Sequence, residues 1–188
     1  GYTCHYVGNP TADYIRNVLH TPHATHHTPN PIIAILPGSR RNEIIRCLPT
    51  MLRATRIVAK DKYDIHVVAA PGIEEDFYKP YLQQETLVHD PYSTLKLAYA
   101  AVVNSGTATL ETALIGCPQT AVYHVTGSKY LEKIFRPIIF SIPYFTLVNI
   151  IPQQEIIQEL IASRFTEENI INELYKLLNN PIYRQRMI

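Results

Sequence analysis

The stretch "VVNSGTATLE", residues 102–111, contains the local pattern that decides the fold. An apolar, β-branched run ends at Asn104, a loop of small residues follows, and helix-forming residues begin at Thr107. Short apolar runs of this kind are typical of strands that are buried on both faces of a sheet. The same order of strand, loop and helix recurs along the chain, which indicates repeated βαβ units.

The predicted elements alternate between strands and helices. The helical pattern that starts at Ile44 contains Pro49, which is expected to open a second helix after a kink because proline is costly inside a helix. The last predicted helix is expected to be capped by Thr166, with Asn169 three residues later. The fold class is therefore α/β, with a Rossmann-like parallel sheet flanked by helices on both faces. Strands are predicted at 32–36, 65–70, 86–89, 101–104 and 119–125, and further helices at 73–84, 92–100, 107–115, 128–135, 153–162 and 167–178.

Residues 1–30 differ in composition from the rest of the chain. They are rich in Pro, Thr and His and show little hydrophobic periodicity, so they are predicted to form an entry segment or linker. Residues 31–188 form the predicted domain. The histidines in the first segment lack a regular ligand spacing, so a polar linker is favoured over a zinc site. These histidines are His20, His23, His26 and His27.

Composition excludes several classes of protein. Apolar residues make up 46% of the 188 residues, enough for a real core. Lys plus Arg is 17 against 16 for Asp plus Glu, so the chain lacks the positive field expected of a nucleic-acid-binding protein. Three cysteines, Cys4, Cys47 and Cys117, are few and odd in number, which favours a reducing compartment such as the cytoplasm.

Targeting and membrane signals are absent from the sequence pattern. No basic segment is followed by the apolar stretch of a signal peptide. The most apolar region, 134–151, is interrupted by Arg136, Pro137 and Pro143, so we expect a buried or interfacial segment there rather than a membrane span.

The loop "LPGSRRNEI", residues 36–44, has the composition of an anion site. Gly38 and Ser39 allow a tight turn directly after a strand, so that successive N–H groups can face one anion at the start of a helix. Arg40 adds a cationic fork suited to phosphate. An ordinary turn with a solvated arginine pair explains this loop equally well.

The loop at 105–107 also has the composition of an anion site and follows another predicted strand. Ser105, Gly106 and Thr107 offer donors and a helix N-terminus, and Glu111 lies one turn further along the same helix face. A carboxylate at that place could accept hydrogen bonds from a ribose diol while the phosphates lie at the helix tip. A serine-type cap with a surface glutamate is the alternative.

Considered together, the two loops favour a nucleoside diphosphate bound across the carboxyl ends of the strands. Neither loop matches the GxGxxG or GxxxxGK[ST] patterns, so dinucleotide redox chemistry and P-loop hydrolysis are not supported. Asp90 and Tyr92 follow another predicted strand and either line the pocket for the base or simply start a helix.

The blocks "YVGNP", "ILPGSRRNEI", "NSGTATLETAL", "CPQTAVYHV" and "TLVNII…EIIQELI" resemble, in order, the C-terminal half of the lipid-A-disaccharide synthase family (glycosyltransferase family 19). The resemblance runs from about Tyr6 to the end. It implies one half of a GT-B fold, without a required metal or other cofactor. It also implies transfer of 2,3-diacylglucosamine from its UDP derivative to 2,3-diacylglucosamine 1-phosphate, which gives the lipid A disaccharide and UDP.

The resemblance also implies roles for particular residues. Donor binding carries over to the matching motif positions, and the catalytic base and acceptor site are expected in an N-terminal domain absent from this chain, which alone would be inactive. The intact enzyme would be cytoplasmic and peripheral to the inner membrane, and a homodimer is left open. Two departures, Val148 where the family has proline and Ala162 where it often has glutamine, put the local loop geometry in doubt. The donor-binding positions are Gly38, Ser39, Arg40, Ser105, Gly106, Thr107, Glu111 and Asn149.

Two alternatives remain open at this point. One is another GT-B protein, either a UDP-N-acetylglucosamine transferase or the related 2-epimerase. The other is a non-catalytic nucleotide-binding module.

Overall fold

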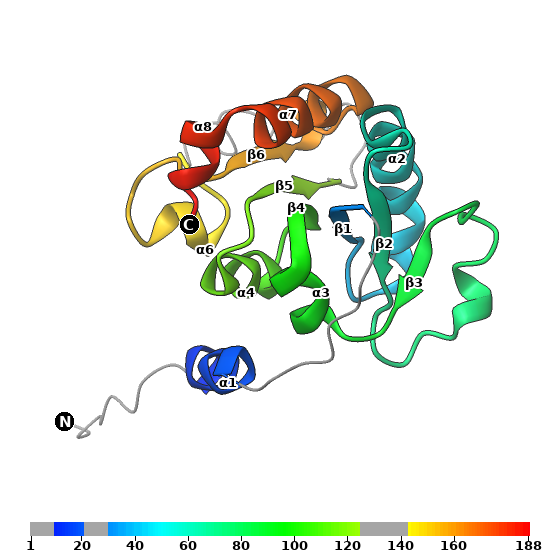
Figure 1. The fold of residues 1–188 in the computed structure, drawn as a ribbon, viewed down its shortest axis with the longest axis horizontal. Coiled ribbons are helices and arrows are strands. Elements are labelled where there is room, and N and C mark those ends of the chain that lie inside the picture. Colours follow the sequence, from blue (N-terminus) through cyan, green and yellow to red (C-terminus); the bar gives the residue numbers. More distant parts are fainter. Residues whose placement is uncertain (1–9, 21–29, 125–142) are drawn as a thin grey trace, which may run out of the picture.

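The computed structural model describes residues 10–20, 30–124 and 143–188. Its centre is a single sheet of six strands in the order β3-β2-β1-β4-β5-β6, in which every neighbouring pair is parallel (Figure 1). The chain moves outward from β1 on one side and then returns to build the other side, as doubly wound sheets do. The predicted α/β class is confirmed. The strands are β1 Ile32–Leu36, β2 Asp64–Val68, β3 Thr86–Val88, β4 Ala98–Asn104, β5 Gln119–Tyr123 and β6 Gln158–Ile161.

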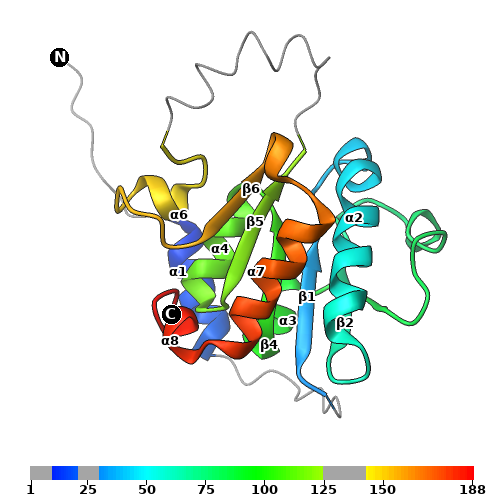
Figure 2. The ribbon, with the colours of Figure 1, turned by 90° about the horizontal axis from the view of Figure 1, so that it is seen from above.

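Helices cover both faces of this sheet. The helices α2 and α7 lie side by side over one face, and α3 and α4 lie over the other, with α1 packed outside them (Figures 1 and 2). The helices are α1 Pro10–His20, α2 Arg41–Ala59, α3 Pro91–Leu97, α4 Thr107–Ile115, α6 Leu147–Ile150, α7 Glu167–Asn179 and α8 Pro181–Gln185, with 3₁₀ turns η1 Glu75–Phe77 and η2 Ala162–Arg164.

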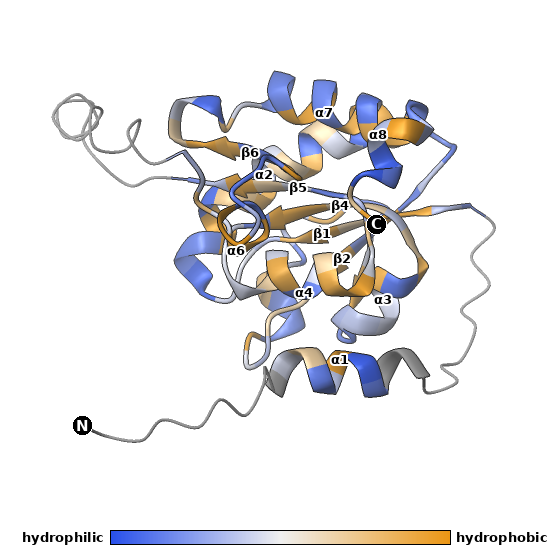
Figure 3. Cartoon of the chain, turned by 90° about the vertical axis from the view of Figure 1, so that its left-hand side faces the viewer, coloured by the Kyte–Doolittle hydropathy of each residue, from blue (hydrophilic) through white to orange (hydrophobic). Residues whose placement is uncertain are grey.

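The strand β1 shows why these residues form a central strand. All five of its side chains are buried, and they alternate between the two helical layers. Ile33 and Ile35 pack with α2 and α7, whereas Ala34 and Leu36 pack on the other side of the sheet. Figure 3 shows the resulting apolar sheet between more polar outer helix faces. A strand buried on both faces needs a continuous apolar run, and this is the pattern in the sequence.

The structure corrects the helix prediction at three places. The prediction at 73–84 is wrong, because only η1 and turns form there and Pro80 lies within the segment. The prediction at 153–162 is also wrong, because Gln158–Ile161 pairs with β5 as the edge strand β6. The predicted break at Pro49 does not occur, since α2 continues from Arg41 to Ala59. The helix predicted at 128–135 lies outside the described residues.

The first 30 residues also differ from the prediction. Residues 10–20 form the amphipathic helix α1, which packs against α3 and α4 and buries Ile15 almost completely. A linker was predicted because this segment is rich in Pro, Thr and His and shows little hydrophobic periodicity, but one buried face suffices to dock a helix. The structure does not describe 21–29, where most of the clustered histidines lie.

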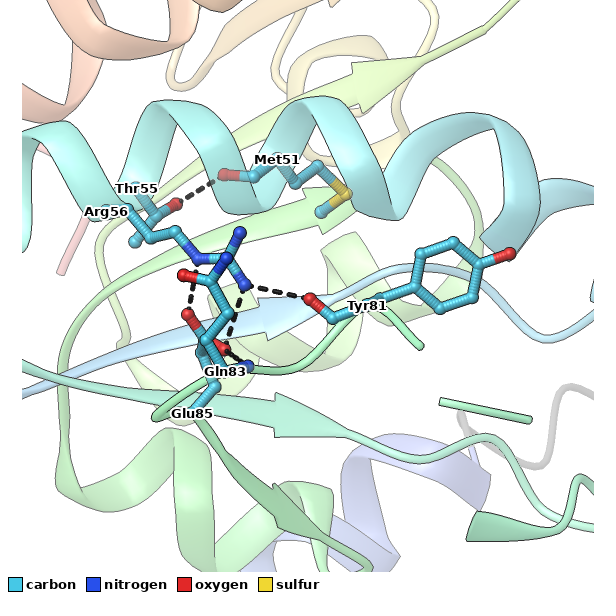
Figure 4. Close-up of polar contacts among 6 residues, drawn as sticks. All are labelled: Met51, Thr55, Arg56, Tyr81, Gln83 and Glu85. Carbon is cyan, nitrogen blue, oxygen red and sulfur yellow. Dashed lines mark hydrogen bonds and ion pairs between the residues drawn. The ribbon is translucent and has the colours of Figure 1, made fainter. Parts of the chain in front are cut away.

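An ion pair fixes the irregular segment between β2 and β3 onto α2. Arg56 donates to both carboxylate oxygens of Glu85, at 2.6 and 3.0 Å, and to the carbonyl of Tyr81 at 2.8 Å (Figure 4). The Glu85 carboxylate also accepts from the Gln83 amide at 2.7 Å. The fork of Arg56 therefore holds the end of this segment in one position before β3 begins.

Candidate functional site

A cavity of about 510 Å³ opens at the carboxyl edge of the sheet, and we call it the donor cleft because the sequence analysis expects a nucleotide-sugar donor at this edge. It lies where the strand order reverses around β1 and β4, the place at which doubly wound sheets bind ligands. Its volume falls within the usual range for small-molecule sites. Both predicted loops and Glu111 contribute to it. The donor cleft is lined by residues 36–39, Glu43, 68–71, His89, Pro91, Tyr92, 104–108 and Glu111.

The first loop is shaped around Gly38. This glycine has φ +120°, in the region that side-chain-bearing residues rarely adopt, and a Cβ there would lie 2.7 Å from the Glu43 carboxylate and 2.8 Å from the Asn104 amide. Only glycine therefore allows the chain to pass this close to the end of β4. The Ser39 amide that follows donates to Glu43 Oε2 at 3.1 Å.

Arg40 lies beside the cleft rather than among its lining residues. Its side chain is 81% exposed and its guanidinium contacts Glu43 Oε1 at 3.0 Å. The carboxylate of Glu43 thus occupies the place next to Ser39 and Arg40 that was predicted for a phosphate. A carboxylate at the start of α2 satisfies the same helix-terminal N–H groups and cation that would bind an anion from solution.

The second loop leads into α4 as predicted, and α4 begins at Thr107. The Ser105 amide donates to the Val122 carbonyl at 2.7 Å, which fixes the loop to β5. Gly106 is the N-cap residue and lacks a capping side chain, so no side chain of its own covers the start of the helix. The first amides of a helix have no partner within it, so those of α4 are suited to an anion in the cleft.

Glu111 lines the donor cleft one turn into α4, opposite Tyr92 of α3. Burial raises the pKa of Glu111, and hydrogen bonding with the Tyr92 hydroxyl partly offsets that rise. The pKa of Tyr92 is raised as well, by burial first and then by the negative charge of Glu111. The pair therefore places a carboxylate, held by a protonated phenol, within the cleft.

Several lining residues were missed by sequence reasoning. Asn104 is buried at the end of β4, where it accepts from the Cys47 thiol at 3.4 Å, and His89 contacts Glu75 at 2.8 Å. A polar residue at the end of an otherwise apolar strand was the signal for Asn104. The opposite wall is held by Tyr78, whose buried hydroxyl accepts from the Ala70 amide at 2.8 Å. Nothing in the local pattern indicated that wall.

Asn149 lies away from the other residues predicted to bind the donor. Its side chain is fully buried and does not line the donor cleft. The amide donates to the Ile157 carbonyl at 2.8 Å and to Glu159 at 3.0 Å, and its oxygen accepts from the Ile156 and Ile157 amides at 2.8 and 2.9 Å. Because these bonds use the hydrogen-bonding capacity of the side chain, Asn149 has a structural role in the fold.

Of the two residues predicted as a base pocket or a helix start, Asp90 forms the helix start. Its carboxylate accepts from the Tyr92 and Ser93 amides at 3.1 and 3.2 Å and caps α3. Asp90 is not among the residues that line the cleft, whereas Tyr92 is.

A second cavity, of about 660 Å³, lies at the opposite edge of the sheet. The starts of β2 and β3 and the Arg56–Glu85 pair line it, and none of the predicted site residues does. Ligands of parallel α/β sheets bind at the carboxyl edge, so the donor cleft is the candidate site.

Two features are absent from the described part of the chain. Within 10–20, 30–124 and 143–188, no three His, Cys, Asp or Glu side chains are grouped so that they could hold a metal ion. Over the same residues, no helix combines the length and the apolar content needed to cross a bilayer.

Comparison with known proteins agrees with this geometry. The family model described as lipid-A-disaccharide synthetase matches residues 1–187. The chain belongs to the lipid-A-disaccharide synthase family. A lipid-A-disaccharide synthase of Syntrophus aciditrophicus is 36% identical over 165 residues, which cover 81% of this chain and 41% of that protein. One of Solibacter usitatus is 30% identical over 200 residues, covering 100% of this chain and 50% of that protein. The chain therefore spans about half the length of its curated relatives.

Solved structures confirm the GT-B type of fold. The calicheamicin glycosyltransferase CalG4 has a TM-score of 0.55 at 15% identity, over 88% of this chain and 38% of that chain. A UDP-GlcNAc 2-epimerase from Neisseria meningitidis, solved with UDP-GlcNAc bound, has a TM-score of 0.51 at 12% identity, over 84% of this chain and 38% of that chain. At such low identities the likeness concerns the fold alone.

Proposed function

We propose that this chain is the donor-binding half of a lipid-A-disaccharide synthase and that the UDP of the donor lies in the donor cleft. One observation carries the proposal: both predicted anion loops and Glu111 line the same cavity at the carboxyl edge of the sheet. These residues come from two separate βα units, and β1 and β4 are neighbours in the sheet. The family membership supports the same ligand class, and the neighbour solved with UDP-GlcNAc is an example of this fold with such a ligand bound.

In this proposal the diphosphate lies between the starts of α2 and α4. The amides of Ser39, Gly106 and Thr107 face its oxygens, and the two helix N-termini stabilise its charge. In the structure, the Glu43 carboxylate accepts from the Ser39 amide and pairs with the Arg40 guanidinium. When the diphosphate binds, Glu43 turns away and Arg40 pairs with a phosphate instead. Glu111 accepts hydrogen bonds from the ribose diol.

The proposed reaction transfers the sugar of UDP-2,3-diacylglucosamine to 2,3-diacylglucosamine 1-phosphate. A base outside this chain removes the proton of the acceptor hydroxyl, and this half stabilises the leaving UDP through fixed amides and Arg40. We further propose that the complete enzyme works in the cytoplasm, peripherally bound to the inner membrane, where its lipid substrates lie. A homodimer is compatible with this arrangement and is tested by sedimentation.

The binding step is tested on this chain by calorimetric titration with UDP. Replacing Glu111 with Gln should weaken UDP binding by about 10- to 100-fold, because a hydrogen bond to a charged group contributes about 1.5–3 kcal/mol. Glu168→Gln is the matched control, since Glu168 is exposed on α7, on the other face of the sheet. Absence of UDP binding at millimolar concentration, or equal affinities of the Glu111→Gln variant and the unchanged chain, would falsify the proposal.

The substrate class is tested with the complete enzyme and competing UDP-sugars. A lipid-A-disaccharide synthase requires the acylated donor, so UDP-2,3-diacylglucosamine should be used and UDP-N-acetylglucosamine should not. Turnover of the unacylated sugar, or its epimerisation, would assign the site to one of the other GT-B activities.

A further inference from the structure

Three side chains from three helices form a continuous row that ends in the donor cleft. Tyr14 comes from α1, Tyr92 from α3 and Glu111 from α4. The rings of Tyr14 and Tyr92 meet edge to face, with centroids 5.4 Å apart and an interplanar angle of 66°. Tyr92 and Glu111 both line the cleft, and the Tyr92 hydroxyl hydrogen-bonds with the carboxylate. Tyr14, from near the start of the chain, and Tyr92 thus converge on the carboxylate of Glu111.

Tyr92 is itself fixed at both ends. Its backbone amide donates to the Asp90 cap at 3.1 Å, which sets the start of α3, and its ring packs against Tyr14. The raised pKa of Tyr92 keeps the phenol protonated and therefore able to donate. A phenol has one proton to give, and a carboxylate can accept at about four positions, so Glu111 keeps capacity for two ribose hydroxyls.

The helix α1 brings Tyr14 to this row. Ile15, the next residue, is 1% exposed and anchors α1 against the layer formed by α3 and α4. Figures 1 and 3 show α1 lying beneath these two helices, outside the sheet. Because aromatic pairs prefer this edge-to-face arrangement, Tyr14 restricts the ring positions open to Tyr92.

We infer that Tyr92 is a positioning residue that holds Glu111 ready for the ribose, and that Tyr14 makes α1 part of the donor site. This inference rests on the proposed binding of UDP in the donor cleft. Without the phenol, Glu111 is free to take several rotamers, and the ligand must order it on binding. The two tyrosines therefore act through Glu111 and touch neither the diphosphate nor the reacting sugar.

A double-mutant cycle on this chain tests Tyr92. Tyr92→Phe removes only the hydroxyl and should weaken UDP binding about fivefold, the effect of one lost hydrogen bond. In the Glu111→Gln background the same substitution should have no further effect, since the carboxylate it positions is gone. Binding of 2′-deoxy-UDP, which lacks one ribose hydroxyl, should be less sensitive to Tyr92→Phe than binding of UDP. Tyr175→Phe is the control, because Tyr175 is 43% exposed on α7.

Tyr14 is tested by a pair of substitutions. Tyr14→Phe keeps the ring and should bind UDP as the unchanged chain does, whereas Tyr14→Ala should weaken binding about two- to threefold. The thermal midpoint of each variant is measured beside its affinity, so that a loss of folding is separated from a loss of positioning.

The outcomes distinguish this inference from the proposed function. If UDP binds and Glu111→Gln weakens binding, but Tyr92→Phe changes nothing, the positioning role is overturned and the proposed function stands. Equal losses from Tyr92→Phe in both backgrounds would also overturn it, because Tyr92 would then act independently of Glu111. Full UDP affinity in a folded Tyr14→Ala variant would remove α1 from the donor site. If the unchanged chain does not bind UDP, the proposed function fails first.

Discussion

Replacing Asn149 with Ala should destabilise the fold strongly and leave the donor cleft unchanged. The substitution removes four hydrogen bonds, two donated to Ile157 O and Glu159 and two accepted from the amides of Ile156 and Ile157. At about 1 kcal/mol for each bond, the free energy of unfolding should fall by roughly 3–4 kcal/mol. This is a large part of the 5–15 kcal/mol that is typical of a whole domain.

Urea denaturation followed by circular dichroism measures this loss. With a denaturant slope of about 2 kcal/mol/M, the midpoint should fall by about 1.5–2 M. Asn179→Ala is the control, because Asn179 is exposed and its side chain makes one bond, to the Tyr175 carbonyl. Its effect should stay within about 0.5 kcal/mol.

UDP affinity, measured on the folded Asn149→Ala variant, completes the test. A structural Asn149 predicts an affinity close to that of the unchanged chain. A variant with unchanged stability and at least about tenfold weaker UDP binding would refute this reasoning and indicate that Asn149 contacts the ligand.

Three further predictions follow from the described contacts. Gly38→Ala should lower the free energy of unfolding by about 1–3 kcal/mol and abolish UDP binding. The added Cβ would clash with the side chains of Glu43 and Asn104, and the positive φ of this position is strained for alanine. Denaturation measures the first effect and calorimetry the second. Burial raises the pKa of Glu85, but bonds from Arg56 and nearby amides outweigh it, so the pKa lies below its usual value of 4.5. The Arg56–Glu85 ion pair therefore stabilises the fold above that pH, and this stabilisation is lost as the Glu85 carboxylate is protonated. In denaturation series, the difference in free energy of unfolding between the unchanged chain and Glu85→Gln should shrink below about pH 4.5. Burial raises the pKa of Cys47 to about 11 and that of Cys117 to about 12, so neither thiol should react with iodoacetamide at pH 8 until the chain unfolds, as peptide mass spectrometry would show.

Local signals sufficed where one segment carries its own pattern. The apolar run at Ile32–Leu36 can only be a buried strand or a short buried helix, and the loop that follows resolves the choice. The start of the last long helix was equally local: Thr166 caps α7 by accepting from the Asn169 amide at 3.2 Å. Both loops predicted to bind an anion were recognised for the same reason, because glycine and small polar residues directly follow a strand.

Other elements depended on partners far away in the sequence. Residues 158–161 resemble part of an amphipathic helix, but the free edge of β5 pairs with them and makes them a strand. Pro49 was expected to break α2, yet Leu48, Met51 and Leu52 on both sides of it are buried in the core. Their packing exceeds the roughly 3 kcal/mol that proline costs inside a helix.

The sequence alone predicted five of the six strands, the two glycine-containing loops that follow strands and the family resemblance, because each depends on short stretches of consecutive residues. The tertiary structure alone decided which of the candidate residues meet. It brought Ser39, Ser105 and Glu111 to one cleft, it buried Asn149 in a hydrogen-bonded scaffold, and it placed α1 against Tyr92. Contacts of this kind follow from the strand order and from the packing of the layers, which no local pattern of residues contains.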